Sequence, residues 1–277
     1  MTPVNSADKA SEASTSREAP AIVYAGGKCL SRSETIIVEE PLSIRIDGSP
    51  YALVMRSPGS EKAHVAGFCL SEGIIDGPAD IRDISFCTEE GINVAAVTLT
   101  PECREKAGAV LERKGFISQT SCGICGKQMA ADIRQMLTPV ETGVKVSGHQ
   151  IMGCVENLPD HQRLHRKTRS AHAAMLLDAD LHPLSAAEDV GRHNALDKAV
   201  GTVLLAGQLH LAAAGVMSSR LSYELVQKAA RAQLSLLIGI SRPTALAVDL
   251  ARSVNMTLVC AKNQEILIFA GEERISA

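Results

Sequence analysis

The second half of the chain, from Gly148 onward, alternates apolar segments of strand length with longer segments of helical periodicity. The strand-like segments are Ala171–Leu177, Leu211–Val216, Ser235–Ile240, Thr257–Cys260 and Glu265–Phe269. The helix-like segments between them are Asn194–Leu205, Tyr223–Gln233 and Thr244–Val254. Regular alternation of strands and helices indicates a sheet that is covered by helices. We therefore expect an α/β unit in this half.

The first half has a different pattern, dominated by short strands. These are Thr35–Val38, Leu42–Ile46, Tyr51–Met55 and Asn93–Leu99, and Asp47-Gly48 is typical of a hairpin turn between the second and third. Helical spacing is found in Glu61–Ile75 and in the basic stretch Arg104–Lys114. We expect a disordered tail over residues 1–20, a smaller β-rich subdomain over 21–120 and an α/β subdomain over 121–277, hence an α/β (α+β) fold.

Composition limits the core and the cellular setting. Aromatic residues make up only 3% of the chain and Trp is absent, so Ala, Leu, Val and Ile must build the core. A net charge of -3 gives no general argument for binding nucleic acid or a membrane surface. No apolar run approaches the roughly 20 residues of a membrane span, and the N-terminus lacks the pattern of a secretory signal. Most of the eight cysteines are scattered, which predicts reduced thiols in the cytoplasm.

The one close cysteine pair is Cys122 and Cys125, in the stretch Thr120-Ser121-Cys122-Gly123-Ile124-Cys125-Gly126-Lys127. Two thiols at this spacing can reach one metal ion, one disulfide or one sulfur atom. The segment after them has the pattern of a helix opening, and thiols near a cation at a helix N-terminus become nucleophilic thiolates. The pair is therefore a candidate for sulfur chemistry, and it would open the α/β subdomain.

Three polar clusters stand where strands are expected to give way to helices. The first, Glu188–Lys198, contains Asp189 as a candidate helix cap and Arg192 or His193 as candidate ligand contacts; a capped, solvated first turn explains it equally well. The second and third are Met217–Glu224 and Ser241–Thr244. Because ligands of open α/β sheets bind at the carboxyl ends of strands, Arg220 and Arg242 are candidate contacts to a phosphate or nucleotide. Neither a dinucleotide fingerprint nor a P-loop is present.

Several long motifs together resemble one family, the FdhD/NarQ family of sulfurtransferases. They are Ser121–Lys127, Gly67–Ile75, Glu188–Lys198 and the segment from Ser218 to Ala229, and the resemblance extends over roughly residues 37–275. It implies a fold similar to that of cytidine deaminases, with a mixed sheet and flanking helices, and a homodimer. The zinc signature of the deaminases is absent, which argues against deamination.

The resemblance implies a sulfur carrier that formate dehydrogenase requires. A cysteine desulfurase would pass persulfide sulfur to Cys122, with Cys125 as the second thiol. The carrier would hand this sulfur to molybdenum bis(molybdopterin guanine dinucleotide), a bound substrate, before the cofactor enters formate dehydrogenase. The family's cofactor-binding stretch matches Cys260, Ala261, Lys262, Asn263, Gln264 and Glu265. No metal ligands, nucleic-acid partner or membrane partner are implied.

Two other uses of the cysteine pair remain open. A structural zinc site needs four ligands, so Cys122 and Cys125 would require scattered partners such as His149 or Cys154. A thioredoxin-like redox pair would follow a strand in a βαβ unit, and no such strand is expected before Cys122.

Overall fold

The structure is a computed structural model, and it describes residues 14–112, 137–140 and 143–276. Its largest sheet has six strands in the order β13-β12-β11-β10-β8-β9. β10, β11 and β12 are parallel to one another, while β8, β9 and β13 run antiparallel to their neighbours. The bounds are β8 His172–Leu177, β9 Pro183–Asp189, β10 Ala214–Arg220, β11 Leu236–Ser241, β12 Thr257–Lys262 and β13 Glu265–Ala270.

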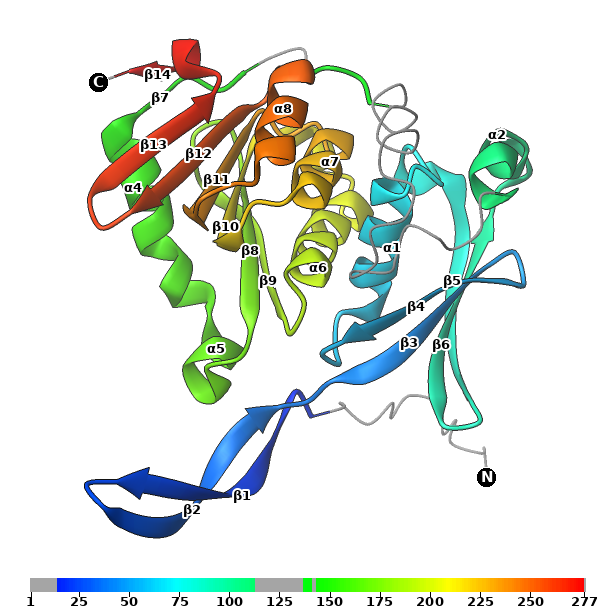
Figure 1. The fold of residues 1–277 in the computed structure, drawn as a ribbon. Helices are drawn as coiled ribbons and strands as arrows, with labels where there is room; N and C mark the ends of the chain where they lie inside the picture. The colour runs from blue at the N-terminus through cyan, green and yellow to red at the C-terminus, as the bar shows by residue number, and fades with distance from the viewer. Residues whose placement is uncertain (1–13, 113–136, 141–142, 277) are drawn as a thin grey trace, which may run out of the picture.

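Helices cover both faces of this sheet (Figure 1). Alternate strand residues face opposite ways, so Ala173 and Met175 pack toward α4, whereas Ala174 and Leu176 pack toward α6, α7 and α8. The bounds are α4 Gly148–Asn157, α6 Arg192–Leu205, α7 Tyr223–Arg231 and α8 Ala245–Ser253. Because both faces are buried, the strands are continuous apolar runs, which explains why the sequence pattern identified most of them.

A second sheet, formed by the first half of the chain, has four strands in the order β4-β3-β6-β5. Asp47 and Gly48 turn β3 into β4 with φ values of 48° and 82°, which confirms the predicted hairpin. The bounds are β3 Glu40–Ile46, β4 Ser49–Arg56, β5 Ile81–Glu89, β6 Ile92–Leu99, α1 Glu61–Ser71 and α2 Pro101–Glu112. α1 lies between this sheet and the helices of the larger one (Figure 1).

The N-terminal residues form a two-stranded arm that extends away from both sheets (Figure 1). β1 (Ser16–Ala25) pairs with β2 (Lys28–Ile37) along their whole length. The expectation of a disordered tail is therefore wrong for residues 16–20, where Glu18 accepts hydrogen bonds from Ser33 and Thr35 at 2.6 Å each. Tail-like composition misled the prediction because these strands have no buried face to require apolar residues.

The remaining elements are short. They are α5 Arg163–Thr168, the strand pair β7 Val146–Ser147 and β14 Ile275–Ser276, and the 3-10 turns Pro78–Asp80, Leu158–His161, Leu209–Leu211 and Glu272–Arg274. No helix within the described ranges is long and apolar enough to cross a bilayer.

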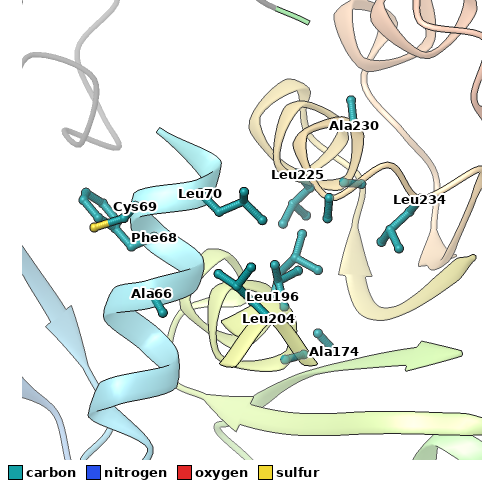
Figure 2. Close-up of a cluster of buried hydrophobic side chains, with 14 of the residues drawn as sticks. Ala66, Phe68, Cys69, Leu70, Ala174, Leu196, Leu204, Leu225, Ala230 and Leu234 are labelled. Atoms are coloured by element: carbon teal, nitrogen blue, oxygen red, sulfur yellow. The ribbon is translucent and has the colours of Figure 1, made fainter. Parts of the chain in front are cut away.

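One hydrophobic core joins the two halves of the chain. It combines residues of β3, β6 and α1 with residues of α6, α7 and α8, and Figure 2 shows Leu70 of α1 facing Leu196 and Leu225. The buried residues are mainly Ala, Leu, Val and Ile, as the composition predicts, with Phe68 as the one buried aromatic among the described residues. The mixed α/β class is thus confirmed, while the likeness to cytidine deaminases stays a prediction.

Helices α1 and α6 are in backbone contact at a pair of glycines. A Cβ atom on Gly67 would lie 1.9 Å from the carbonyl oxygen of Asp197, and one on Gly201 would lie 1.7 Å from that of Ala63. Real Cβ atoms do not approach backbone this closely, so both positions need the missing side chain. The contact brings the buried polar groups of the two helices together.

Candidate functional site

Most of the candidate residues lie at one edge of the six-stranded sheet. The parallel strands β10, β11 and β12 end there, at Arg220, Ser241 and Lys262, and Arg220 pairs in register with Ser241. Because β8 runs antiparallel to β10, and β9 antiparallel to β8, β8 begins and β9 ends at the same edge, where His172 pairs with Asp189. The topology thus gathers the three clusters that the sequence analysis singled out.

Residues 260–265 form the tight hairpin that joins β12 to β13. Lys262 pairs with Glu265, and Asn263 and Gln264 occupy the turn with φ values of 52° and 63°. The Gln264 side chain donates a hydrogen bond of 3.1 Å to Glu156 of α4. The stretch is therefore a defined element at the edge, with Lys262 to Glu265 exposed and Cys260 and Ala261 buried.

Three positively charged side chains lie at neighbouring strand ends, and their guanidinium and ammonium groups have no carboxylate partner among the described residues. Arg220, Arg242 and Lys262 are exposed and form no ion pair with any residue that the structure describes. Burial raises the pKa of the nearby Cys260 thiol, although Arg242 and Lys262 act in the opposite direction. The side chains are therefore positioned to bind an anion at this edge, and Cys260 stays a protonated thiol.

The two serines before Arg220 are used within the sheet. β10 continues to Arg220 instead of ending at Val216, so Ser218 and Ser219 are strand residues. The Ser218 hydroxyl accepts a 2.7 Å hydrogen bond from the Ala173 amide, and the Ser219 hydroxyl donates to the Arg220 carbonyl. These two hydroxyls of the Met217–Glu224 cluster therefore stabilise the strand end, at a place where the sequence analysis expected the strand to have given way to a helix.

Asp189 does not cap α6, contrary to one reading of its position. Gly191 is the N-cap residue, and no side chain caps the helix. Asp189 is fully buried and forms a 2.7 Å ion pair with Lys198, and it accepts hydrogen bonds from the Ser57 and Gly191 amides at 3.1 and 2.9 Å. Its role is to join β9 and α6 to the end of β4.

A second buried ion pair connects α6 with α7. Lys228 donates to both carboxylate oxygens of Asp197, at 2.9 and 2.7 Å, and Ser71 of α1 donates to the same carboxylate at 2.8 Å. The Lys228 ammonium also lies 5.6 Å from the centre of the Phe68 ring. The sequence analysis predicted neither the Asp189–Lys198 pair nor the Asp197–Lys228 pair. The available signal was a charged residue on α6 or α7 at a position whose apolar neighbours in the helical pattern predict burial.

The Asp197–Lys228 pair and Phe68 line a cavity of about 320 Å³ between β4, α1, α6 and α7. Glu72, Asp197, Glu224, His193 and Lys228 are among its lining residues. Burial raises the pKa of Glu72, although Lys228 opposes the shift. A hydrogen bond from His193, with 3.0 Å between the two groups, lowers the pKa of Glu224.

His193 does not form part of a nucleophilic triad. Its Nε2 atom lies 3.0 Å from Glu224 and 3.2 Å from the Ser222 hydroxyl, so the acid and the hydroxyl share one ring nitrogen. A triad requires them on opposite nitrogens.

Ser222 occupies the N-cap position of α7 without a side-chain cap, whereas Thr244 caps α8 by accepting from the Ala247 amide at 3.3 Å.

Cys122 and Cys125 lie outside the described residues. Among the described cysteines all six are free thiols. Cys69 and Cys103 are buried like small apolar residues, whereas Cys29 and Cys87 are exposed. Within the described ranges no group of three or more His, Cys, Asp or Glu side chains could hold a metal ion.

Comparison with known proteins links this arrangement to one family. The model of the FdhD/NarQ family matches residues 37–276. A protein of Anaeromyxobacter dehalogenans called sulfur carrier protein FdhD is 37% identical over 87% of this chain and 88% of its own length. A protein of the same name from Streptomyces coelicolor is 36% identical over 90% of this chain and 92% of its own length.

The fold also matches a solved structure. The crystal structure of a proposed formate dehydrogenase accessory protein from Desulfotalea psychrophila superposes with a TM-score of 0.76 and 22% identity, over 95% of this chain and 100% of the other. Identity at that level shows the fold alone. With the family model covering most of the chain and relatives above 30% identity, the chain belongs to the FdhD/NarQ family.

Proposed function

We propose that the chain is a sulfur carrier required for formate dehydrogenase activity. The observation that carries the proposal is the family membership, with relatives named sulfur carrier proteins matching 87 to 90% of the chain. The proposed partners are a cysteine desulfurase, formate dehydrogenase and a second copy of this chain. The proposed setting is the cytoplasm, where thiols stay reduced.

The first step is a persulfide transfer to Cys122. The Cys122 thiolate attacks the terminal sulfur of a persulfide on the desulfurase, and the sulfur–sulfur bond of that persulfide breaks. The desulfurase leaves as a thiolate, and Cys122 carries the extra sulfur with no net change in oxidation state. A thiolate is the required nucleophile, which a lowered thiol pKa would favour.

The second step releases the sulfur toward the cofactor and requires two electrons. The Cys125 thiolate attacks the inner sulfur of the Cys122 persulfide, forming a Cys122–Cys125 disulfide and releasing sulfide. The sulfide becomes a ligand of molybdenum in molybdenum bis(molybdopterin guanine dinucleotide), which is the substrate here. A cellular dithiol reductant then returns the disulfide to two thiols, which balances the cycle.

The cofactor would bind along the sheet edge that ends in Arg220, Arg242 and Lys262. Adjacent strands are about 4.8 Å apart, so these three strand ends span roughly 10 Å. That is the scale of a pyrophosphate with its flanking groups, and charge-assisted hydrogen bonds from Arg and Lys suit phosphoryl oxygens. Exposed residues of the 262–265 hairpin adjoin the same span.

Mass spectrometry after incubation with a cysteine desulfurase and cysteine tests the proposal. We expect one added sulfur on Cys122 of the wild type, none in Cys122→Ala, and accumulation with slower sulfide release in Cys125→Ala. Cys122→Ala should also abolish maturation of formate dehydrogenase, while Cys125→Ala should have a milder effect. Stoichiometric bound zinc, or a disulfide without any persulfide, would instead identify a structural or redox use of the two thiols.

A further inference from the structure

A basic groove lies between the root of the β1–β2 arm, α5 and the four-stranded sheet, and Lys62, Arg163 and Lys167 are among its lining residues. α5 packs beside β2 at the root of the arm (Figure 1). The larger part of the groove has a volume of about 1110 Å³, and a smaller part of about 340 Å³ adjoins it along β9, because Thr15, Ser60 and Lys167 line both. Pockets for small ligands measure about 300–1,000 Å³, so the whole groove suits a segment of chain better.

The positive charges of the groove come from two helices and are unpaired. Lys62 on α1 and Lys167 on α5 line the larger part, and Arg163 on α5 lines the smaller part. All three side chains are exposed and form no ion pair with any residue that the structure describes. Arg163 and Lys167 are four residues apart on one helix, a spacing at which like charges repel each other. A negatively charged partner would relieve that repulsion.

The carboxylates around the groove already have partners. Glu40 and Glu61 each lie 3.3 Å from the guanidinium of Arg56, whose side chain is buried. Glu188 accepts hydrogen bonds of 2.6 and 2.7 Å from two amides in the first turn of α5. These acids therefore fix the walls of the groove to one another, and they leave its three exposed cations without a counter-charge.

The floor of the groove is less polar than its walls. Phe86 on β5 lines it with 42% of its surface exposed, next to Val94 on β6 and Leu42 on β3. Successive side chains of an extended segment point to opposite sides, so apolar ones would meet this floor while acidic ones meet the cations. A nucleic acid fits less well, because the chain as a whole carries a net charge of -3 and would repel a long polyanion.

We propose that the basic groove binds an extended acidic segment of a partner protein, with Lys62, Arg163 and Lys167 as the contacts to its carboxylates. The groove's charges and shape support this docking site independently of the sulfur-transfer scheme. Exposed ion pairs are individually weak and are screened by salt, so the segment binds reversibly. Complementary charge of this kind mainly speeds the encounter with the partner and fixes its orientation.

Fluorescence anisotropy with an acidic peptide and the full chain tests the groove. The probe is a fluorescein-labelled peptide in which glutamate alternates with serine around a central leucine, and its control has glutamine in place of each glutamate. We expect the wild type to bind the probe and not the control, with an affinity that falls as the ionic strength rises from about 0.05 to 0.3 M.

Variants of the groove locate the binding by charge. Lys62→Gln combined with Lys167→Gln should weaken binding of the probe by about 4- to 25-fold, because each exposed ion pair is worth roughly two- to fivefold in affinity. Lys106→Gln combined with Lys145→Gln is the matched control, since it makes the same charge change at exposed positions that do not line the groove. The control variant should bind the probe like the wild type.

Carbodiimide coupling locates the bound peptide chemically. The reagent joins a glutamate carboxylate to a neighbouring lysine amine as an amide and takes up the water as a urea. Mass spectrometry of the digested product then identifies the lysine, and we expect links at Lys62 and Lys167.

The docking site is overturned if the wild type does not bind the probe, or if the variant of Lys62 and Lys167 binds it as tightly as the wild type. Links at Lys106, Lys145 or Lys262 in place of the groove lysines would also overturn it. Tighter binding of a single-stranded oligonucleotide of equal charge would identify a nucleic-acid surface instead. A change from dimer to monomer in the groove variant, measured by light scattering, would show that a second copy of the chain fills the groove, which equally refutes the proposal.

Discussion

Replacing Gly67 with alanine should strongly destabilise the protein, because the helices α1 and α6 touch there through their backbones. The new Cβ atom would lie 1.9 Å from the Asp197 carbonyl oxygen, whereas ordinary contact begins at 3.4 Å. The helices would have to separate by about 1.5 Å, since a helix backbone cannot rotate away like a side chain. Separation would also loosen the contacts of Ser71 and Lys228 with the Asp197 carboxylate.

The magnitude follows from two opposing terms. Overpacking of a close-packed core costs about 1–3 kcal/mol, and the upper end applies where backbone meets backbone. Alanine is about 1 kcal/mol better than glycine within a helix. The net loss in the free energy of unfolding for Gly67→Ala should therefore be about 2 kcal/mol or more, a large part of the stability of a typical protein.

Gly153→Ala provides a matched control. Gly153 lies within α4, and a Cβ atom there would meet nothing within 4 Å. The same substitution should therefore stabilise the protein by up to about 1 kcal/mol. Urea unfolding monitored by circular dichroism measures both free energies. Stability of Gly67→Ala within about 0.5 kcal/mol of the wild type would refute the reasoning, as would an equal loss in Gly153→Ala.

Three further predictions concern stability. Asp197→Asn should cost about 3–5 kcal/mol in urea unfolding because it leaves the buried Lys228 ammonium without its counter-charge; a smaller loss than in Thr244→Ala would contradict this. Thr244→Ala itself should cost about 1 kcal/mol through loss of the α8 cap, and no measurable loss would show that the cap is unimportant. Burial holds the pKa of His64 well below 6.5, so the unfolded chain binds a proton there that the folded chain does not, and stability falls as the pH drops below 6.5. His64→Leu should reduce the slope of unfolding free energy against pH by about 1.4 kcal/mol per unit between pH 6 and 5, and an unchanged slope would argue against a neutral His64.

The sequence pattern predicted those elements whose environment is uniform. Strands β8, β10, β11 and β12 are buried on both faces, so their apolar runs are unmistakable. β5 and β9 were missed because each presents polar or exposed residues along much of its length. The strand order, with β8 between β10 and β9, depends on contacts across the whole chain and is not readable from local pattern.

The sequence could predict the site residues whose position follows from the direction of the parallel strands. It could not predict the role of residues whose partners lie far away in the sequence. The sequence pattern predicts that Arg220 and Arg242 lie at strand ends, and the parallel topology brings those ends to one edge together with Lys262 at the end of β12. Asp189 was interpreted as a helix cap because its true partners include the Ser57 amide, 132 residues earlier. No local rule identifies a contact of that range.

The single core that joins both halves has a consequence for the order of events during synthesis. Helix α1 ends at Ser71, but the helix that covers it, α6, ends at Leu205. At roughly 5–20 residues per second, a ribosome takes about 7–27 s to make the intervening chain. For that time the apolar face of α1 and its sheet have no covering partner, so the nascent N-terminal half should bind chaperones until α6 has been made.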